Sequence, residues 1–252
     1  PNWMKQRLEA AGIRSINNIV DITNFVMLEL GQPLHAYDYD TIKGKTLIAT
    51  KANPNEKITT LDDVERNLTE EMIVIADISG PVGVAGIMGG LATEVTANTK
   101  TIVLEAATFQ GVSVRRTSRA FGLRSEASGR FERGVDIVNI DKVLDRAAHL
   151  IQQLNAGVPC SGVIDVYPEP IGVTEISVTT AEINNYLGSN ITENEIVNIL
   201  EKLEFKVKVD QTLLITVPSW RFDVTCKADI TEEIARIYGF NNIKSTLPYG
   251  NM

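Results

Sequence analysis

The pattern of hydrophobic and polar positions changes character along the chain, beginning with helical spacing in the first thirty residues. Apolar residues there predict a short helix at residues 3–8 and a longer one at residues 16–30, which ends at Gly31. Pro33 then favours an extended segment, and His35 lies within it. The chain therefore opens with two helices that lead into a strand-like segment.

Between residues 46 and 104 the pattern becomes a series of short apolar runs that are typical of β-strands. Turn residues such as Gly80-Pro81 separate them. An amphipathic helix follows at residues 141–155, where the apolar side chains form one stripe. Helices thus flank a region of strands, which predicts a mixed-sheet α+β domain over residues 1–168. The strand-like runs are TLIAT, KITTL, MIVIAD, PVGVAGI and TIVLEA.

A second unit begins after the linker Tyr167-Pro168-Glu169-Pro170. Thr192 and Glu195 have the spacing of a capping box at the start of a helix. The pattern predicts a small winged-helix-like domain over residues 171–247. Its expected elements are a strand at 175–179, helices at 181–187 and 193–203, strands FKVKV and LLITV, and a last helix from about 230 to 238.

Composition places the chain among ordinary globular proteins, with 252 residues, 44% hydrophobic and 22% charged. Two cysteines are too few for a disulfide framework, which favours a reducing, cytoplasmic location. No apolar stretch is long enough to cross a membrane, and no signal peptide opens the chain. Because the chain starts at Pro1 and not at Met, we expect it to be a piece of a longer polypeptide.

Charge is distributed unevenly along the chain. The formal net charge of −8 argues against nucleic-acid or membrane binding over the whole surface. Residues 115–133, however, hold six arginines against Glu126 and Glu132, which gives this segment a local net charge of +4. Arginine binds phosphate in bidentate geometry, so this segment is a candidate phosphate-binding surface. A solvated helical face paired with nearby acids explains the pattern equally well.

A few single residues are candidates for chemistry. His35 could line a pocket, although a structural hydrogen bond is the more common role for a lone histidine. Glu105 ends an apolar run and points either to solvent or into a pocket. Ser125 and Ser128 lie in no nucleophile elbow, which argues against a serine hydrolase. The run PVGVAGIMGG lacks the Lys-Ser/Thr of a phosphate loop and favours tight turns or close approach to a ligand.

Four carboxylates lie within eleven residues near the C-terminal end of the chain. Their oxygens could bind a hard cation such as Mg²⁺. Acidic residues also favour the first turn of a helix, where Asp229 and Glu232 fit an N-cap and its box. From the residues alone, the helix-capping role is the favoured one. The four are Asp223, Asp229, Glu232 and Glu233.

Long stretches of the chain resemble the β subunit of bacterial phenylalanyl-tRNA synthetase. The resemblance runs from the first residues to about Pro248 and covers a middle part of that subunit, the B3/B4 editing region followed by the B5 domain. The stretches that carry it are GIRSINNIVDITNFVMLELGQPLHAYD, PVGVAGIMGG, IVLEAATF, RTSRAFGLRSEASGRFERGVD and VPSWRFDVTCKADITEEIARIYGFNNI.

The resemblance implies that the first unit hydrolyses tyrosine wrongly esterified to tRNA(Phe). A synthetic site built for phenylalanine cannot strongly reject an analogue that only adds a hydroxyl, so a second site is needed. By position in the matching stretches, Glu105 accepts the tyrosine hydroxyl, while Arg14 and His35 lie near the ester and the terminal adenosine. Water is the expected nucleophile, and His35 is either its general base or a positioning group. The implied pocket wall consists of Gly89, Ser125 and Ala127.

For the second unit, the resemblance implies that the same four carboxylates bind Mg²⁺ at a site shared with the α subunit. It further implies an α2β2 tetramer, tRNA(Phe) as a partner, ATP use by the whole enzyme, and a cytoplasmic location without membrane contact. The chief alternative is a non-catalytic scaffold that positions tRNA or assembles subunits. A dinucleotide- or phosphate-binding enzyme built on GVAGIMGG is a third option, and it requires a βαβ context.

Overall fold

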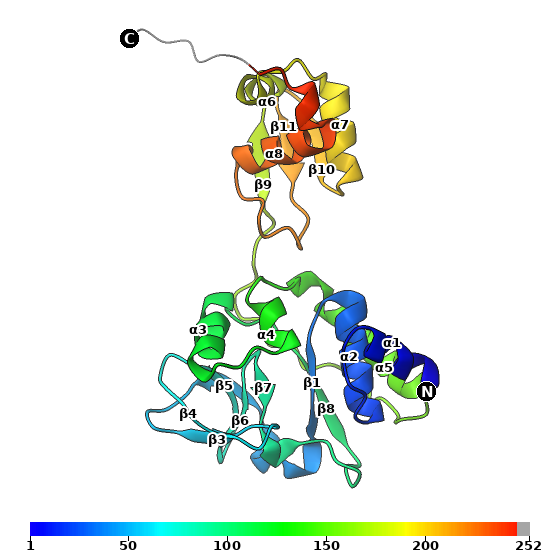
Figure 1. Cartoon of the computed structure of the whole chain (residues 1–252), viewed down its shortest axis with the longest axis vertical. Helices are drawn as coiled ribbons and strands as arrows, with labels where there is room; N and C mark the ends of the chain where they lie inside the picture. Colours follow the sequence, from blue (N-terminus) through cyan, green and yellow to red (C-terminus); the bar gives the residue numbers. More distant parts are fainter. Residues whose placement is uncertain (246–252) are drawn as a thin grey trace. The chain divides into compact units, whose positions relative to one another are not determined.

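The structure is a computed structural model that describes residues 1–245 and divides the chain into two compact units (Figure 1). The first unit is Pro1–Val163, and the second begins at Ile164. Helices and antiparallel sheets occur in both units, which confirms the α+β class. The exact domain limits 1–168 and 171–247 stay predictions, and residues 246–247 lie outside the described part, as does Pro248.

Three helices form one side of the first unit (Figure 1). They are α1 (Asn2–Ala10), α2 (Asn18–Leu30) and α5 (Ile140–Gln153). Helix α2 begins two residues later than the pattern predicts because the Asn17 side chain caps it, accepting a hydrogen bond from the Val20 amide at 2.9 Å. It ends where predicted, since Gly31 adopts a left-handed conformation with φ 78°. The shared core of these helices includes Met4, Leu8, Ile22, Val26, Val143, Ala147 and Leu150.

A two-stranded antiparallel ribbon separates this helical core from the remaining strands (Figure 1). It pairs β1 (Leu34–Asp38) with β8 (Ile102–Ala106), and His35 lies directly opposite Glu105. Successive side chains of a strand point to opposite faces. One face of the ribbon packs on the helices through Leu34, Ala36, Ile102 and Leu104, while the other carries His35, Tyr37, Val103 and Glu105.

The other face of the ribbon meets a four-stranded sheet in the order β2-β5-β6-β7. Every strand pairing in residues 1–245 is antiparallel, so the predicted mixed sheet is wrong in this respect. Short turns join β5 to β6 and β6 to β7, whereas parallel neighbours need a crossover of about a dozen residues. The strands are β2 (Ile48–Lys51), β5 (Ile73–Asp77), β6 (Gly80–Val84) and β7 (Met88–Gly89), with a separate hairpin of β3 (Lys57–Thr59) and β4 (Glu65–Asn67).

Two helices follow β8 and carry the arginine-rich segment. These are α3 (Gly111–Phe121) and α4 (Glu126–Phe131). Val114 of α3 and Phe131 of α4 are buried against apolar residues of the four-stranded sheet and its turns. The arginines therefore lie on two helices whose apolar sides pack on the sheet, or on the segments directly beside these helices.

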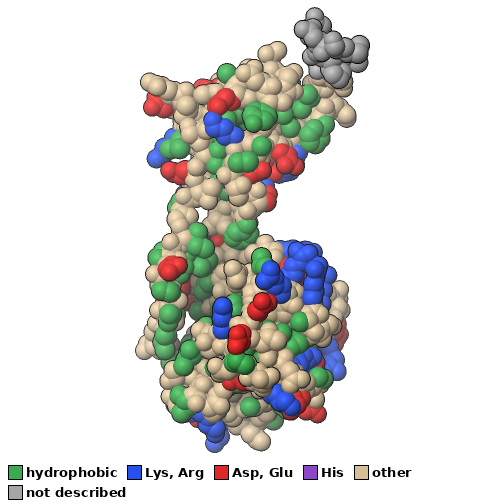
Figure 2. Space-filling view, turned by 90° about the vertical axis from the view of Figure 1, so that its left-hand side faces the viewer, with side chains coloured by type: hydrophobic (Ala, Val, Ile, Leu, Met, Phe, Trp, Pro, Cys, Tyr) green, Lys and Arg blue, Asp and Glu red, His purple; other side chains and the backbone are tan. Residues whose placement is uncertain are grey.

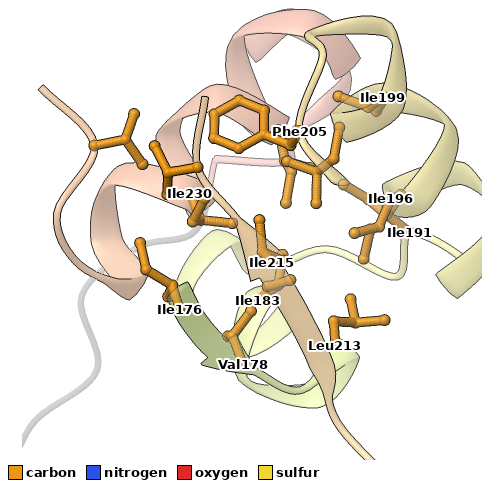
Figure 3. Packing of buried hydrophobic residues seen from close by; sticks show 14 residues of the cluster. Ile176, Val178, Ile183, Ile191, Ile196, Ile199, Phe205, Leu213, Ile215 and Ile230 are labelled. Carbon is orange, nitrogen blue, oxygen red and sulfur yellow. The ribbon is translucent and has the colours of Figure 1, made fainter. Parts of the chain in front are cut away.

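In its described part, residues 164–245, the second unit contains a three-stranded antiparallel sheet in the order β10-β11-β9 and three α-helices. Each predicted element is present, in the order expected of a winged-helix-like domain. Figure 3 shows the isoleucine-rich core, in which Ile183, Ile196 and Ile215 from three elements point toward one another. The elements are β9 (Glu175–Val178), α6 (Thr180–Leu187), α7 (Glu193–Lys202), β10 (Lys206–Val209), β11 (Leu213–Thr216) and α8 (Lys227–Tyr238).

The helix starts of this unit differ from the predicted ones in detail. Thr192 caps α7 by accepting from the Glu195 amide at 3.3 Å, but the return half of the predicted box is not formed. A complete capping box instead opens α6, between Thr179 and Glu182. Helix α8 begins three residues earlier than predicted, because Cys226 is its N-cap. Across residues 1–245, none of the helices has the length and apolar character that crossing a membrane requires.

Candidate active site

A pocket of about 80 Å³ lies where the ribbon, the four-stranded sheet and α4 meet. Four of the residues singled out from the sequence line it: His35, Gly89, Glu105 and Ala127. They come from β1, β7, β8 and α4, which are far apart in the chain. Apolar side chains such as Ile75, Val84, Phe109 and Phe131 form most of the remaining wall.

Strand register brings His35 and Glu105 together. As directly opposed residues of an antiparallel pair, they place their side chains on the same face of the ribbon. Tyr37 lies two residues after His35 and so shares that face. The three polar side chains all line the pocket.

Tyr37 is the functional candidate that the sequence interpretation missed. Its hydroxyl donates a hydrogen bond to Oε2 of Glu105 at 2.5 Å, and the residue is 1% exposed. Burial raises the pKa of Glu105, and the Tyr37 hydrogen bond offsets part of that rise. Burial and the Glu105 charge raise the pKa of Tyr37, so its hydroxyl stays protonated and remains a donor. The spacing His35-x-Tyr37 on a strand was the available signal.

His35 is held by packing and makes no hydrogen bond through Nε2 with any residue in 1–245, although this atom is buried. Its ring lies edge-on to Tyr37, with centroids 4.4 Å apart and planes at 86°. Burial lowers the pKa of His35 to about 4, so the imidazole is neutral at pH 7. An unpaired buried nitrogen is costly to keep, which argues against a purely structural hydrogen-bonding role.

Gly89 permits close approach of the backbone to His35. A Cβ atom at this position would lie 2.5 Å from Nε2 of the imidazole, a separation that real side chains do not tolerate. Close approach of this glycine-rich run to a ligand stays a prediction, and the group that it approaches in the structure is the His35 ring. Any side chain at Gly89 must displace the ring or distort β7.

Ser125 supports the pocket wall without lining the pocket. Its Oγ accepts from the Ser128 amide at 3.0 Å, which caps α4, and donates to the carbonyl of Ile87 at 2.8 Å. The second bond fastens the start of α4 to the glycine-rich turn between β6 and β7. Ala127, in the first turn of α4, lines the pocket as a result.

Arg14 is not brought into the pocket. It is exposed in the loop between α1 and α2 and does not belong to the lining residues. The buried Asp21 holds this loop by accepting from Ser15 Oγ at 2.5 Å and from the Ile16 amide at 2.8 Å. A role for Arg14 beside the ester stays a prediction.

The six arginines of α3, α4 and their flanks divide into two groups. Arg115 pairs with Glu132 at 3.4 Å, and Arg130 pairs with Glu126 at 2.7 Å. The other four are exposed and form no ion pair within residues 1–245. Figure 2 shows Lys and Arg side chains gathered on one part of the surface of the first unit. Pairing with nearby acids thus describes two of the arginines, while the other four remain candidates for a phosphate-binding surface. The four unpaired arginines are Arg116, Arg119, Arg124 and Arg133.

Two of the four carboxylates in the second unit are neutralised by arginines. Arg221 contacts Asp223 at 2.6 Å and Glu233 at 2.9 Å, and Arg236 contacts Glu233 at 2.5 Å. These hydrogen bonds hold the pKa of Asp223 below its usual range and lower the pKa of Glu233 to about 2. Glu233 is buried while Glu232 is exposed, so the two adjacent side chains have different surroundings.

Asp229 has a helix-capping position. It is the third residue of α8, and its carboxylate accepts from the amides of Thr225 at 2.7 Å and Cys226 at 3.0 Å. No group of three or more His, Cys, Asp or Glu side chains in residues 1–245 is arranged to hold a metal ion. As they lie here, the four carboxylates do not fit a bound cation, and magnesium binding stays a prediction.

The glycine-rich run joins β6 to β7 within an antiparallel sheet. A dinucleotide site of the type considered from GVAGIMGG requires a strand–helix–strand unit with a parallel pair. Every strand pair that the structure describes is antiparallel, so this third option has no support from the fold.

The chain belongs to the B3/4 domain family, which matches residues 1–156, and the tRNA synthetase B5 domain matches residues 176–240. The chain is similar over nearly its whole length to proteins named phenylalanine–tRNA ligase beta subunit, which confirms the resemblance found in the sequence. Identity is 51% to the protein of Moorella thermoacetica, 49% to that of Carboxydothermus hydrogenoformans and 46% to that of Bacillus subtilis. The alignments cover 100%, 99% and 98% of this chain but only 31%, 32% and 31% of those proteins.

Among the solved structures that the chain matches is the crystal structure of an N-terminal fragment of the phenylalanyl-tRNA synthetase beta-subunit from Pyrococcus horikoshii. Its TM-score is 0.40 and its sequence identity is 16%, with 86% of this chain and 64% of that chain covered. The chain spans about a third of the length of the curated relatives it matches.

The neutral state of His35 predicts a loss of stability in acid. Its pKa is about 4 when folded and about 6.5 when unfolded, so protonation favours the unfolded chain increasingly as pH falls between these values. We expect His35→Gln to remove this part of the pH dependence. Urea unfolding of the first unit, followed by Trp3 fluorescence in a Trp220→Phe background, measures it.

The matched control is His149→Gln, which removes the second of the two histidines in the chain. This variant should keep the acid sensitivity of the unsubstituted protein. If His35→Gln and His149→Gln show the same dependence between pH 6.5 and 4, His35 is not buried in its neutral form.

Proposed function

We propose that the first unit is an editing site that hydrolyses the ester between tyrosine and tRNA(Phe). The observation that carries this proposal is the half-buried pair of Glu105 and neutral His35 on one face of the β1–β8 ribbon, in an otherwise largely apolar pocket. An apolar pocket with a few convergent polar groups and shifted pKa values is the usual form of a small-molecule site.

Selection of tyrosine over phenylalanine is assigned to Glu105. Tyr37 occupies Oε2, whereas Oε1 accepts no hydrogen bond from any residue in 1–245. A tyrosyl hydroxyl can donate to Oε1, but a phenylalanyl ring leaves this oxygen unpaired while displacing water from it. Leaving a buried acceptor unsatisfied costs about 1–3 kcal/mol, or more for a charged group.

The hydrolysis itself is assigned to a water molecule, because the residues that line the pocket include no serine, threonine or cysteine. The neutral Nε2 of His35 can accept a hydrogen bond from this water or from the terminal ribose. A group with a pKa of about 4 is a weak base at pH 7, which favours positioning by His35 over general-base catalysis.

The size of the pocket limits how the substrate enters. At about 80 Å³ it is smaller than the roughly 150 Å³ cavity that holds a benzene ring in an engineered protein core. A tyrosyl ring therefore requires outward movement of wall side chains, or lies partly outside the enclosed volume. Met88 and Phe109 are wall residues that could move without breaking a backbone pairing between strands.

The tRNA end is assigned to the unpaired arginines of α3 and of the segments that flank α4. Arg116, Arg119, Arg124 and Arg133 are exposed without carboxylate partners in residues 1–245, and α4 carries the wall residue Ala127. Guanidinium groups bind phosphate in bidentate geometry. Single-stranded nucleotides leading to the ester could thus be held beside the pocket, despite the acidic charge of the whole chain.

The names of the relatives support a wider proposal, and the resemblance implies its further details. Within a complete protein, this chain would form part of a phenylalanine–tRNA ligase, an aminoacyl-tRNA synthetase of protein biosynthesis, assembled with an α subunit in an α2β2 tetramer. ATP use belongs to that whole enzyme, and a cytoplasmic location is part of the same proposal. The synthetic site lies outside this chain.

A scaffold role is the second candidate function. Two observations favour it: Tyr37 already engages Glu105, and the pocket is small. In this case the unit would position tRNA or assemble subunits without hydrolysing an ester. The two functions differ in whether substitution of Glu105 changes deacylation.

Magnesium binding by the second unit is proposed only for the assembled enzyme, in which the α subunit would share the site. In this chain the arginine contacts of Asp223 and Glu233 compete with any cation. No step of the editing reaction depends on this ion.

Replacement of Glu105 tests the editing proposal. Glu105→Ala should leave the fold intact, because its partner Tyr37 stays packed among apolar residues, but it should abolish the preference for tyrosyl over phenylalanyl ester. The ratio of the two deacylation rates should fall by about tenfold or more. The measurement is deacylation of Tyr-tRNA(Phe) and Phe-tRNA(Phe) by the assembled α/β enzyme.

Glu94→Gln, a change at an exposed carboxylate of the same unit, is the control and should leave the ratio unchanged. Circular dichroism checks the fold of both variants. A Glu105→Ala enzyme that clears Tyr-tRNA(Phe) as fast as the unsubstituted enzyme would contradict the role assigned to Glu105.

The arginine surface predicts a specific loss of tRNA affinity. Arg116 and Arg119 lie one helical turn apart on α3, so Arg116→Gln/Arg119→Gln removes two adjacent positive charges. We expect weaker binding, and a salt dependence of log K reduced by about 0.7 for each lost contact to a single strand. Lys5→Gln/Lys142→Gln removes the same charge elsewhere, and an equal loss there would contradict a specific surface.

Magnesium binding is tested by calorimetric titration of the assembled α/β enzyme. Asp229→Asn removes the charge but keeps an oxygen that can accept from the Thr225 and Cys226 amides, so α8 should stay capped. We expect this variant to lose one class of Mg²⁺ sites, while Asp210→Asn, an exposed change in the same unit, retains it. Unchanged binding in Asp229→Asn would contradict the proposed site.

A further inference from the structure

The pocket is lined by a phenol of the protein itself, the side chain of Tyr37, which is the same chemical group as the side chain of the proposed tyrosyl substrate. We propose that Tyr37 is a positioning residue, which binds one oxygen of Glu105 and thereby presents the other oxygen to the hydroxyl of a tyrosyl substrate. This inference rests on the proposed editing function and adds a determinant of its specificity.

The position of Tyr37 follows from strand geometry. Its pairing partner is Val103, so Glu105 lies on the diagonal, a distance that an aromatic side chain can span. The hydroxyl reaches Oε2 of Glu105 at 2.5 Å, a length typical of a bond to an ionised acceptor. The register of β1 with β8 thus places the Tyr37 hydroxyl against one oxygen of the Glu105 carboxylate.

Packing holds the Tyr37 ring in one orientation. The residue is 1% exposed and belongs to a buried cluster with Ile75, Val82 and Ala85. A Cβ at Gly83 would lie 3.6 Å from its hydroxyl, so the backbone of β6 closes off the far side of that group. With the ring enclosed, the hydroxyl has Glu105 as its only hydrogen-bond acceptor in residues 1–245.

The titratable groups that line the pocket are His35, Tyr37 and Glu105. The elements packed around Glu105 from the sheet and from α4 contribute only glycine and apolar side chains to the lining. Within residues 1–245 no cationic side chain therefore stabilises the carboxylate, and burial raises its pKa. The Tyr37 bond opposes this rise, while Tyr37 itself stays protonated. Tyr37 thus favours the ionised form of Glu105, the stronger acceptor for a substrate hydroxyl.

Two donors can then share one carboxylate. With a tyrosyl substrate, Tyr37 binds Oε2 and the substrate binds Oε1, so both oxygens are paired. With a phenylalanyl substrate, only the Tyr37 bond remains. Without Tyr37, Glu105 could rotate and would be protonated at a higher pH, which weakens the distinction between the two substrates.

The test is Tyr37→Phe, which removes one hydroxyl and keeps the ring. In the assembled α/β enzyme, the ratio of Tyr-tRNA(Phe) to Phe-tRNA(Phe) deacylation should fall about three- to tenfold at pH 7. In a plot of this ratio against pH, the fall on the acid side should begin at a higher pH in Tyr37→Phe. Raising the pH should therefore restore part of the ratio. Tyr39→Phe is the matched control, since the Tyr39 hydroxyl makes no hydrogen bond within residues 1–245 and that residue does not line the pocket.

If Tyr37 had only a structural role, Tyr37→Phe would lower the stability of the protein without shifting the pH at which the deacylation ratio falls. If Tyr37→Phe lowers the ratio equally at every pH, or leaves it unchanged, the inference is overturned. A double variant with Glu105→Gln sharpens the test: because glutamine does not titrate, Tyr37→Phe should no longer shift the pH profile in that background.

A second measurement does not depend on catalysis. In the 252-residue chain, ¹³C NMR of labelled glutamate carboxyls follows the titration of Glu105, assigned by its loss in Glu105→Gln. We expect its midpoint to move to higher pH in Tyr37→Phe but not in Tyr39→Phe. An unchanged midpoint would overturn the inference even if the enzyme edits. If the midpoint moves but the unsubstituted enzyme shows no preference for tyrosyl ester, the proposed function fails and the Tyr37–Glu105 coupling stands.

Discussion

The pairing of β1 with β8 is the constraint on which the pocket depends. Side chains alternate along both strands, so the ribbon sends Ala36 and Leu104 into the helical core and His35 and Glu105 into the pocket. A slip of one residue in a strand would exchange its faces, burying polar groups among the helices. Packing of α1, α2 and α5 on one face therefore fixes the chemistry that the other face presents. The helical core and the pocket thus lie on opposite faces of the same two strands.

Carboxylates in the two units illustrate how environment determines role. Glu233 lies between Arg221 and Arg236, which lower its pKa to about 2 and make it part of a structural ion-pair network. Among the described residues, no cation lies beside Glu105. Burial raises the pKa of Glu105, and the hydrogen bond from the Tyr37 hydroxyl lowers it in part. Burying a polar or charged group without enough hydrogen-bond or ionic partners lowers the stability of the fold, and such groups concentrate at functional sites. The same argument applies to His35, whose Nε2 is buried without a partner in residues 1–245.

The local pattern predicted most elements of both units, because helical and strand periodicity are properties of short segments. The mixed sheet was predicted wrongly, because the short turns that join β5, β6 and β7 make these strands antiparallel. Other features depend on neighbours in space. Arg14 is exposed and does not line the pocket, and Ser125 supports the wall through Ile87 without lining it, so the roles given to both residues stay predictions. Tyr37 was missed because nothing in its local sequence shows that Glu105 lies within reach.

The sequence by itself determined the two units, their order of helices and strands, the arginine-rich segment and the family, since each depends on runs of adjacent residues. Only the tertiary structure decided which polar groups meet. His35, Gly89, Glu105 and Ala127 come from four separate elements, and their contacts depend on strand register and helix packing. The tertiary structure also separated paired from unpaired arginines and placed Asp223 and Glu233 against Arg221. Hydrophobic periodicity can be recognised in short stretches of sequence. Electrostatic pairing depends on distances between side chains that are set only when the chain has folded.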